Sequence, residues 1–187
     1  MEEVGIQQLL LEGGATNLDL DLVSVQPVGL EVAADYRTLR SPETYLGYGR
    51  GSGLATPDGL WADTPHDYAP PTGLGLNEWA PAGEWNIAQR AATSTSAGAR
   101  LAFRFGARDV NLVMGPATRG AAIPFRVTLD GAHAAGQYGT DVSPDGSGVV
   151  SEQRTYQLIR QSAPITERDF EIEFLEPGAE LYCFTFG

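Results

Sequence analysis

The feature that most constrains this chain is a hydrophobic pattern of period two, which recurs through most of its length between turn residues. The pattern begins at residues 18–22 (LDLDL) and is clearest at residues 99–105, where Leu101, Phe103 and Phe105 alternate with other residue types. Successive side chains of a strand point to opposite faces of a sheet, so this pattern predicts strands with one buried face. The 23 glycines and 12 prolines favour many turns over long helices.

Short antiparallel strands are expected across the second half of the chain. The turn signals between them include Asp130-Gly131, which is typical of a hairpin, and Glu176-Pro177-Gly178. The expected strands cover residues 84–92, 99–105, 110–114, 123–129, 149–159, 170–174 and 181–186. Strands that recur about every 8 to 12 residues are typical of a β-sandwich or barrel. The sequence therefore predicts an all-β fold and argues against a parallel α/β fold.

Two segments depart from the strand pattern. Residues 2–12 are rich in apolar side chains and end at Gly13-Gly14, so we expect one short helix there. Residues 41–82 are rich in proline and glycine, yet they also contain several tyrosines and tryptophans. A disordered linker lacks such aromatic content. We therefore expect residues 41–82 to form an ordered, irregular segment that covers one face of the β domain.

The charge of the chain limits the partners that it can bind. It carries 12 Lys+Arg against 24 Asp+Glu, a formal net charge of −12, and every basic residue is an arginine. Nucleic acids and anionic membrane surfaces are bound through basic residues, so neither is an expected partner. The longest apolar runs fall far short of the roughly 20 residues of a membrane-spanning helix. We therefore expect a soluble chain with no direct membrane insertion.

Few residues are suited to catalysis or metal binding. Cys183 lies in an alternating apolar stretch and has no second cysteine to pair with, so it predicts a buried, unreactive thiol. His66 and His133 belong to no catalytic motif and are expected in surface loops. Asp141 and Asp145 offer the oxygen ligands that calcium takes, but their loop lacks the closing Glu of an EF-hand. A solvated hairpin loop is therefore favoured over a metal site, and no cofactor is expected.

Glycoside hydrolysis requires two carboxylates in one cleft. Glu78 and Glu84 flank a short segment and have Trp79 and Trp85 beside them, which would allow a pair that faces a sugar. This spacing is not specific as a motif. The chain is therefore not expected to be an enzyme.

The aromatic-rich segment suggests ligand binding instead. Aromatic rings stack on the flat faces of sugars, while Asn, Glu and Arg side chains bind the hydroxyl groups. The candidates in this segment are Tyr45, Tyr48, Arg50, Trp61, Asn77 and Trp79. The same rings could instead form the lid of the hydrophobic core. Both interpretations stay open at the level of sequence.

Several strings along the chain resemble one family. They are RSPETYLGY (40–48), LNEWA (76–80), GEW (83–85), FRFGARDVNLVMG (103–115), FRVTLDG (125–131), YQLIRQ (156–161), FEIEFL (170–175) and FTFG (184–187). Over residues 36–187 the chain is similar to the C-terminal domain of DipZ-type proteins, which resemble the thiol-disulfide transporters of cytochrome c biogenesis.

The resemblance implies a jelly-roll β-sandwich, similar to carbohydrate-binding modules and galactose-binding domains, over residues 36–187. In that family a membrane segment is followed by an extracytoplasmic thioredoxin-like domain and then by this domain, and shorter relatives lack the membrane part. Residues 1–35 would then be the helix and linker from a preceding thioredoxin-like domain. The CxxC motif of that domain is absent from this sequence, so the redox activity does not carry over. The implied location is extracytoplasmic or periplasmic, within a membrane-anchored or secreted parent.

The function predicted is that of a non-catalytic binding module, which holds a neutral carbohydrate or cell-envelope glycan and is associated with a thioredoxin-like domain. The residues that match the family strings and are expected near its site are Glu43, Tyr45, Tyr48, Asn77, Trp79, Arg154, Tyr156 and Arg160. The alternative is a protein-interaction or structural domain that docks on the thioredoxin-like domain or its substrates and binds no sugar.

Overall fold

The structure is a computed structural model that describes residues 2–15 and 26–187. The chain divides into two compact units, with the boundary between Glu31 and Val32. The alternating segment at residues 18–22 lies outside the described residues.

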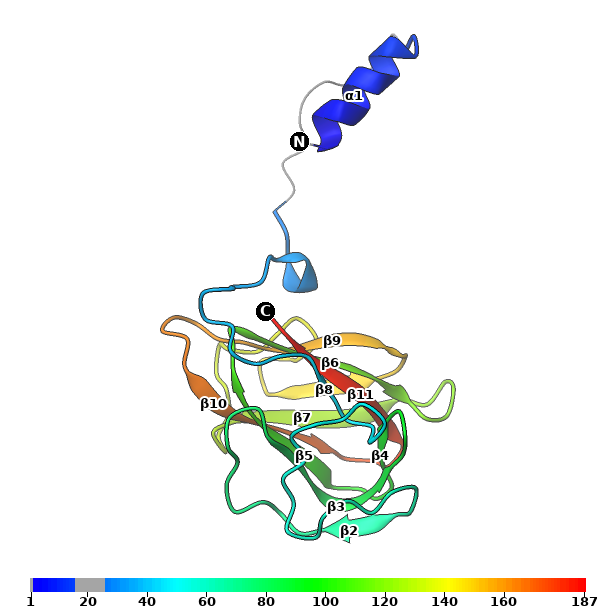
Figure 1. Ribbon diagram of the computed structural model, residues 1–187, viewed down its shortest axis with the longest axis vertical. Helices are drawn as coiled ribbons and strands as arrows, with labels where there is room; N and C mark the ends of the chain where they lie inside the picture. The colour runs from blue at the N-terminus through cyan, green and yellow to red at the C-terminus, as the bar shows by residue number, and fades with distance from the viewer. Residues whose placement is uncertain (1, 16–25) are drawn as a thin grey trace. The chain divides into compact units, whose positions relative to one another are not determined.

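The first unit contains the expected helix, which is confirmed as α1 (Glu2–Glu12) (Figure 1). Gly14 follows the helix with φ of 89°, a left-handed conformation that favours glycine and commonly ends helices. Its N–H donates to the carbonyl of Leu11 at 3.0 Å. A short 3-10 helix, η1 (Gly29–Glu31), ends this unit. In the part of the chain that the structure describes, no helix is long and apolar enough to cross a membrane.

The second unit consists of antiparallel strands, which confirms the prediction of an all-β fold. In chain order, the strands are β1 (Thr44–Tyr45), β2 (His66–Tyr68), β3 (Trp79–Ile87), β4 (Ala92–Ser94), β5 (Ala99–Gly106), β6 (Asp109–Pro116), β7 (Ile123–Leu129), β8 (Ser147–Val150), β9 (Arg154–Arg160), β10 (Glu167–Phe174) and β11 (Ala179–Phe186).

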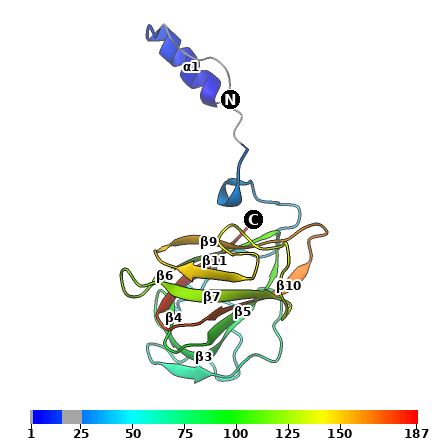
Figure 2. The same cartoon turned by 180° about the vertical axis from the view of Figure 1, so that it is seen from behind.

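The strands pair as a long ribbon that is folded back on itself. At its tip β7 pairs with β8, and moving away from the tip β6 pairs with β9, β5 with β10 and β4 with β11. The rolled ribbon forms two layers with the strand orders β8-β7-β10-β5 and β4-β11-β6-β9 (Figure 1 and Figure 2). This connectivity is that of a jelly roll, so the predicted β-sandwich is confirmed.

Strand β3 joins the two layers at one corner. Residues 79–82 of β3 pair with β5, and residues 85–87 pair with β4. Gly83 lies between these two halves with φ of 81°, which glycine adopts readily because it has no Cβ. A Cβ at this position would lie 3.4 Å from the Cα of Ala99. The strand can therefore bend from one layer into the other at this glycine.

Two of the expected strands are wrong, because each is a hairpin. The stretch 84–92 turns at residues 88–91, between β3 and β4, and the stretch 149–159 turns at residues 151–153, between β8 and β9. Neither turn contains glycine or proline, so the usual local signals are missing. Tertiary contacts hold the turns instead. The loop after β1 packs on the first turn, and the hydroxyl of Tyr156 accepts two backbone N–H groups of the second.

The segment at residues 41–82 is irregular for most of its length, as expected, and contains β1, β2 and the start of β3. Its aromatic rings divide between the core and the surface. Tyr68 and Trp79 are 1% and 2% exposed, whereas Trp61 is 50% exposed. Some of these rings therefore form part of the hydrophobic core, as Tyr68 and Trp79 do, whereas others, such as Trp61, lie at the surface where a ligand could contact them.

The core between the layers is centred on phenylalanine rings. Phe184 of β11 is fully buried, and its ring centroid lies 4.9 Å from that of Phe103 and 5.8 Å from that of Phe170. These three rings come from both layers of the sandwich. Packing around Phe184 therefore ties the layers together.

We predict that Phe184→Ala lowers the free energy of unfolding by about 3 to 5 kcal/mol, because it leaves a cavity among packed rings. Urea denaturation of the variant and the parent protein measures this change. Val149→Ala serves as the control, because Val149 is 49% exposed. The control should change stability by less than about 0.5 kcal/mol. Equal effects of the two substitutions would contradict a core centred on Phe184.

Candidate functional site

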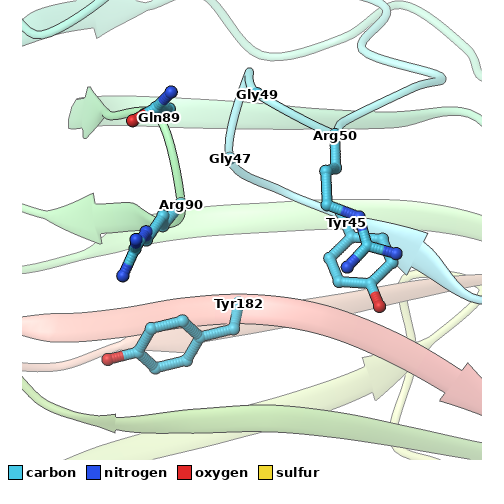
Figure 3. A pocket seen from close by; sticks show the side chains of 7 residues that line it. All are labelled: Tyr45, Gly47, Gly49, Arg50, Gln89, Arg90 and Tyr182. Carbon is cyan, nitrogen blue, oxygen red and sulfur yellow. The ribbon is translucent and has the colours of Figure 1, made fainter.

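A cavity of about 380 Å³ opens beside β11. Its lining comes from β1 with the loop that follows it, the turn between β3 and β4, and β11 itself (Figure 3). The lining residues are Tyr45, Gly47, Gly49, Arg50, Gln89, Arg90 and Tyr182. Its volume lies within the range of roughly 300 to 1,000 Å³ that is typical of small-molecule sites.

The cavity exists because β11 changes its pairing partner along one edge. β4 pairs with Glu180 and Leu181, and further along the strand β1 pairs with Cys183 and Phe184. Tyr182 lies between these pairs and is the extra residue of a β-bulge opposite β6. A bulge redirects a side chain out of the regular alternation. The ring of Tyr182 accordingly lines the space near the place where one partner strand replaces the other (Figure 3).

The opposite wall is a glycine-rich loop, residues 47–51 (GYGRG), that packs on the β3–β4 turn through its backbone. Two N–H groups of the loop donate to carbonyl groups of the turn at 2.9 and 3.1 Å. A Cβ on Gly47 would lie 2.2 Å from the carbonyl carbon of Arg90, and a Cβ on Gly49 would lie 2.8 Å from the carbonyl oxygen of Gln89. Only glycine allows such a close approach of two backbones. The loop and the turn therefore form one preorganised unit.

Tyrosine rings and guanidinium groups supply the chemistry of the cavity. The guanidinium of Arg50 lies over the ring of Tyr45, with Cζ 3.9 Å from the ring centroid, which is a cation–π contact. Arg90 extends from the turn on the other side of the cavity (Figure 3). It is exposed and pairs with no carboxylate among the described residues.

The tyrosine hydroxyls interact with nearby carboxylates. A hydrogen bond to Glu43 raises the pKa of Tyr45. Burial, followed by a hydrogen bond to Glu180, raises the pKa of Tyr182 to about 12. Both phenols are therefore neutral near neutral pH. The cavity thus combines neutral hydroxyl groups and cationic donors, with carboxylate acceptors beside the two tyrosines.

Cys183 lies next to this site on β11, where it pairs with Tyr45 of β1. Its thiol is free, and the prediction that it is buried is confirmed. Burial raises the pKa of the thiol, and the nearby charge of Glu43 adds to this effect. The Sγ atom lies 4.0 Å from a carboxylate oxygen of Glu43.

Three of the predicted site residues, Glu43, Tyr45 and Arg50, come together at the cavity beside β11. Tyr48 and Trp79 instead line a smaller cavity of about 110 Å³. The hydroxyl of Tyr48 donates to a carboxylate oxygen of Asp63 at 2.7 Å, and this bond raises the pKa of the phenol. The indole N–H of Trp79 donates to a backbone carbonyl at 2.9 Å, so this ring is fixed in the core wall.

Trp61 is not among the lining residues of either cavity and stacks on His66, with ring centroids 4.6 Å apart and planes at 5°. His66 was expected in a surface loop, but it begins β2 and is partly buried. The difference arises because β2 pairs with β3, which holds His66 opposite Trp85.

Asn77 and Arg160 have structural partners away from the cavity. The side-chain oxygen of Asn77 accepts the hydroxyl of Ser41 at 2.6 Å, and Asn77 itself has φ of 67°, which asparagine tolerates better than most residues. Arg160 pairs with the buried Asp109 at 2.7 Å, and this carboxylate raises the pKa of the guanidinium. Both residues therefore contribute to the scaffold.

Arg154 and Tyr156 lie together on β9, with the guanidinium carbon 3.7 Å from the ring centroid. Arg154 also pairs with Asp141 at 2.7 Å, and the second oxygen of Asp141 accepts the backbone N–H of Gln157 at 2.8 Å. Asp145 accepts the hydroxyl of Ser147 at 2.6 Å. The two candidate calcium ligands are thus bound to separate partners within the chain. Among the described residues, no group of three or more acidic, histidine or cysteine side chains could hold a metal ion.

The carboxylates of Glu78 and Glu84 also have separate partners. Glu78 precedes β3 and accepts the N–H of Gly75 at 2.7 Å. Glu84 lies within β3 and accepts the hydroxyl of Thr95 at 2.8 Å. Neither carboxylate lines the cavity beside β11.

Comparison with protein families identifies the β domain. A family model described as the thioredoxin-like C-terminal domain matches residues 41–187. The chain belongs to this family. The match includes all three segments that line the cavity, so the candidate site is part of the thioredoxin-like C-terminal domain itself.

Other comparisons add little to this assignment. No curated protein matches the chain. Among solved structures, a family two carbohydrate esterase from Clostridium thermocellum, in complex with cellohexaose, is similar at 11% identity with a TM-score of 0.39. The similarity covers 52% of this chain and 27% of that chain, so the two correspond over part of their lengths only.

Gln89, Arg90 and Tyr182 of the thioredoxin-like C-terminal domain were missed at the level of sequence. The first two lie in the turn that was taken for part of a strand, and Tyr182 reads as an ordinary position in an alternating strand. The one available signal was the Gln89-Arg90 pair, which interrupts an otherwise largely apolar run at residues 85–92.

We predict that Gly47→Ala destabilises the domain by about 1 to 3 kcal/mol, because the added methyl group must displace the loop or the turn. Gly73→Ala is a matched control, since a Cβ there meets no atom within 4 Å and its φ is not left-handed. The control should leave stability unchanged or raise it slightly. Urea denaturation of both variants measures the difference. Equal stability of the two variants would rule out a tight contact at Gly47.

The pKa of Tyr182, about 12 against an ordinary value of 10.0, predicts a pH dependence of stability. As the pH rises, the phenol of Tyr182 loses its proton in the unfolded chain before it does so in the folded one. The contribution of Tyr182 to the free energy of unfolding is therefore complete below about pH 10 and is lost as the pH rises towards about 12. Tyr182→Phe should reduce the fall in stability across that window. Glu180→Gln should lower the pKa of Tyr182 but leave it above the ordinary value, because burial remains. Phenolate absorbance during alkaline titration tests this, and an unchanged pKa in Glu180→Gln would contradict the hydrogen bond.

Proposed function

We propose that this domain is a non-catalytic carbohydrate-binding module and that the cavity beside β11 is its binding site. The observation that carries the proposal is the convergence of two tyrosines, Tyr45 and Tyr182, with Arg50 and Arg90 on a rigid backbone. Rings of this kind stack on the apolar face of a sugar, and guanidinium groups donate hydrogen bonds to its hydroxyl oxygens. Because the loop and turn are preorganised, little ordering is required on binding.

The charge of the chain supports a neutral glycan as the ligand. The formal net charge of −12 repels anionic polymers as they approach. Near the cavity, the carboxylates of Glu43 and Glu180 can accept hydrogen bonds from sugar hydroxyl groups in addition to those from the tyrosines. A neutral polyol matches both the donors and the acceptors of such a site.

The composition of the cavity supports binding without catalysis. Among the described residues that line it, none is a carboxylate, histidine or cysteine, so in that part of the chain the usual groups for acid–base or nucleophilic chemistry do not face it directly. In this proposal the domain holds its ligand and leaves it chemically unchanged.

The resemblance to DipZ-type proteins supports a place beside a thioredoxin-like domain of the cell envelope. In this proposal the module localises or orients a thiol-disulfide protein by holding an envelope glycan, in an extracytoplasmic setting. Residues 1–35 would serve as the connection to the preceding thioredoxin-like domain.

A second candidate function is docking on the thioredoxin-like domain or its substrates, without sugar binding. The observation that favours it is the apolar surface of α1, where Ile6 and Leu9 are 59% and 68% exposed. Leu10 and Leu11 are also exposed. Apolar surface of this kind is typical of sites that pack against another protein.

We predict saturable binding of this chain to a neutral oligosaccharide in a panel of α- and β-linked glucans and mannans, measured on a glycan array and then by calorimetric titration. Arg90→Ala and Tyr182→Ala should each weaken binding by about tenfold or more, equivalent to about 1.4 kcal/mol. Arg126→Ala is the matched control, since Arg126 is an exposed arginine on β7 in the other layer. Urea denaturation establishes that each variant is folded.

The same panel separates the two candidate functions. If no saccharide binds, and the chain instead binds a thioredoxin-like domain added in trans, the carbohydrate proposal is wrong. Loss of that protein binding in Leu9→Ser, with Arg90→Ala unaffected, would then assign the interaction to α1.

A further inference from the structure

We infer that the ligand is a linear glycan that crosses β11 and also occupies a second cavity at the start of that strand. This inference rests on the proposed function, because it extends the same site. It assigns a second group of binding residues and specifies a polymer, not a single sugar unit, as the ligand.

The second cavity has a volume of about 610 Å³. It lies where the loop after β6 and the β8–β9 turn approach β11. Its lining residues are Pro116, Ala117, Arg119, Gly120, Ser151, Glu152, Gln153 and Glu180. The guanidinium, amide, hydroxyl and carboxylate groups among them are the types that bind sugar hydroxyls.

The two cavities are lined by residues two apart on β11. Glu180 lines the second cavity and Tyr182 lines the first. Glu180 and Tyr182 are both partly exposed, while Leu181 between them is fully buried, so both side chains project from the outer face of β11. Glu180 contributes to the raised pKa of Tyr182, so the two side chains interact, and in Figure 3 the hydroxyl of Tyr182 points away from Tyr45. The pair therefore forms a shared wall over which an extended ligand can pass.

Arginines without acidic partners lie in both cavities. Most arginines of this domain pair with carboxylates, as Arg104 does with Asp169 at 3.1 Å. Within the described ranges, Arg50 and Arg90 in the first cavity and Arg119 in the second pair with no carboxylate, as is also true of Arg37 and Arg126 outside both cavities. A guanidinium presents several donors in a fixed plane, which suits two neighbouring hydroxyl oxygens. A repeating glycan presents the same hydroxyl groups to both positions.

The backbone also holds the second cavity in a fixed form. A Cβ on Gly115 of β6 would lie 2.8 Å from the Cα of Gln153, so the β8–β9 turn packs directly on β6. The hydroxyl of Tyr156 accepts the backbone N–H groups of Ser151 and Glu152 at 3.2 and 3.3 Å. Gln153 is therefore carried by a supported turn, as Arg90 is in the first cavity.

The test is the dependence of affinity on chain length. Three glycans are used: an α-linked glucan, a β-linked glucan and an α-linked mannan. For each glycan, a disaccharide and a hexasaccharide of the same linkage are titrated against the full chain. For the glycan that binds, we expect the affinity of the hexasaccharide to exceed that of the disaccharide by about tenfold or more. Arg119→Ala and Gln153→Ala should remove this gain and leave disaccharide binding unchanged. Arg90→Ala should weaken both ligands, and Arg126→Ala should weaken neither.

The outcomes distinguish a failure of the two-cavity inference from a failure of the proposed carbohydrate binding. Equal affinity for the disaccharide and the hexasaccharide, or a length-dependent gain that survives in both Arg119→Ala and Gln153→Ala, would overturn this inference and leave the carbohydrate module intact. Failure of every saccharide to bind would overturn the proposed function, and this inference with it. The two substituted side chains are exposed, so folded variants are expected, and urea denaturation verifies this.

Discussion

Hydrogen bonding along both edges of β11 holds the second unit together and also creates its candidate site. One edge pairs with β6 throughout, while the other pairs first with β4 and then with β1. The strand directs Phe184 into the core and, at its bulge, Tyr182 into the cavity. The stability of the domain and the shape of the candidate site therefore depend on the same backbone, which also makes the site as rigid as the sandwich that carries it.

Much of the fold could be predicted because its signals are local. The strand expected at residues 123–129 coincides with β7, since its alternation is regular and Asp130-Gly131 marks the turn. The same holds for α1, which ends at a pair of glycines. The hairpin turns at residues 88–91 and 151–153 could not be found in this way. Their conformations depend on partners from distant parts of the chain, which leave no mark on the local sequence.

The candidate site was only partly predictable for the same reason. Tyr45 and Arg50 lie within the aromatic-rich segment and could be named from residue type alone. Arg90 required the missed turn, and Tyr182 required the missed bulge. Trp79 was named for its chemistry, but its indole is buried in the core wall, where it stabilises the fold. Residue type indicated the chemistry, whereas tertiary pairing determined which groups converge.

The glycine-rich loop separates two roles along one short stretch of chain. Its glycines, at positions 47, 49 and 51, make the close backbone approaches, while the residues between them project their side chains. Tyr48 faces the smaller cavity and Arg50 the larger one. Under the proposed function, a substitution at Arg50 would change the side chains that face the ligand, while the glycines keep the close backbone contacts. The loop therefore assigns its backbone contacts to the glycines and its side-chain chemistry to the residues between them.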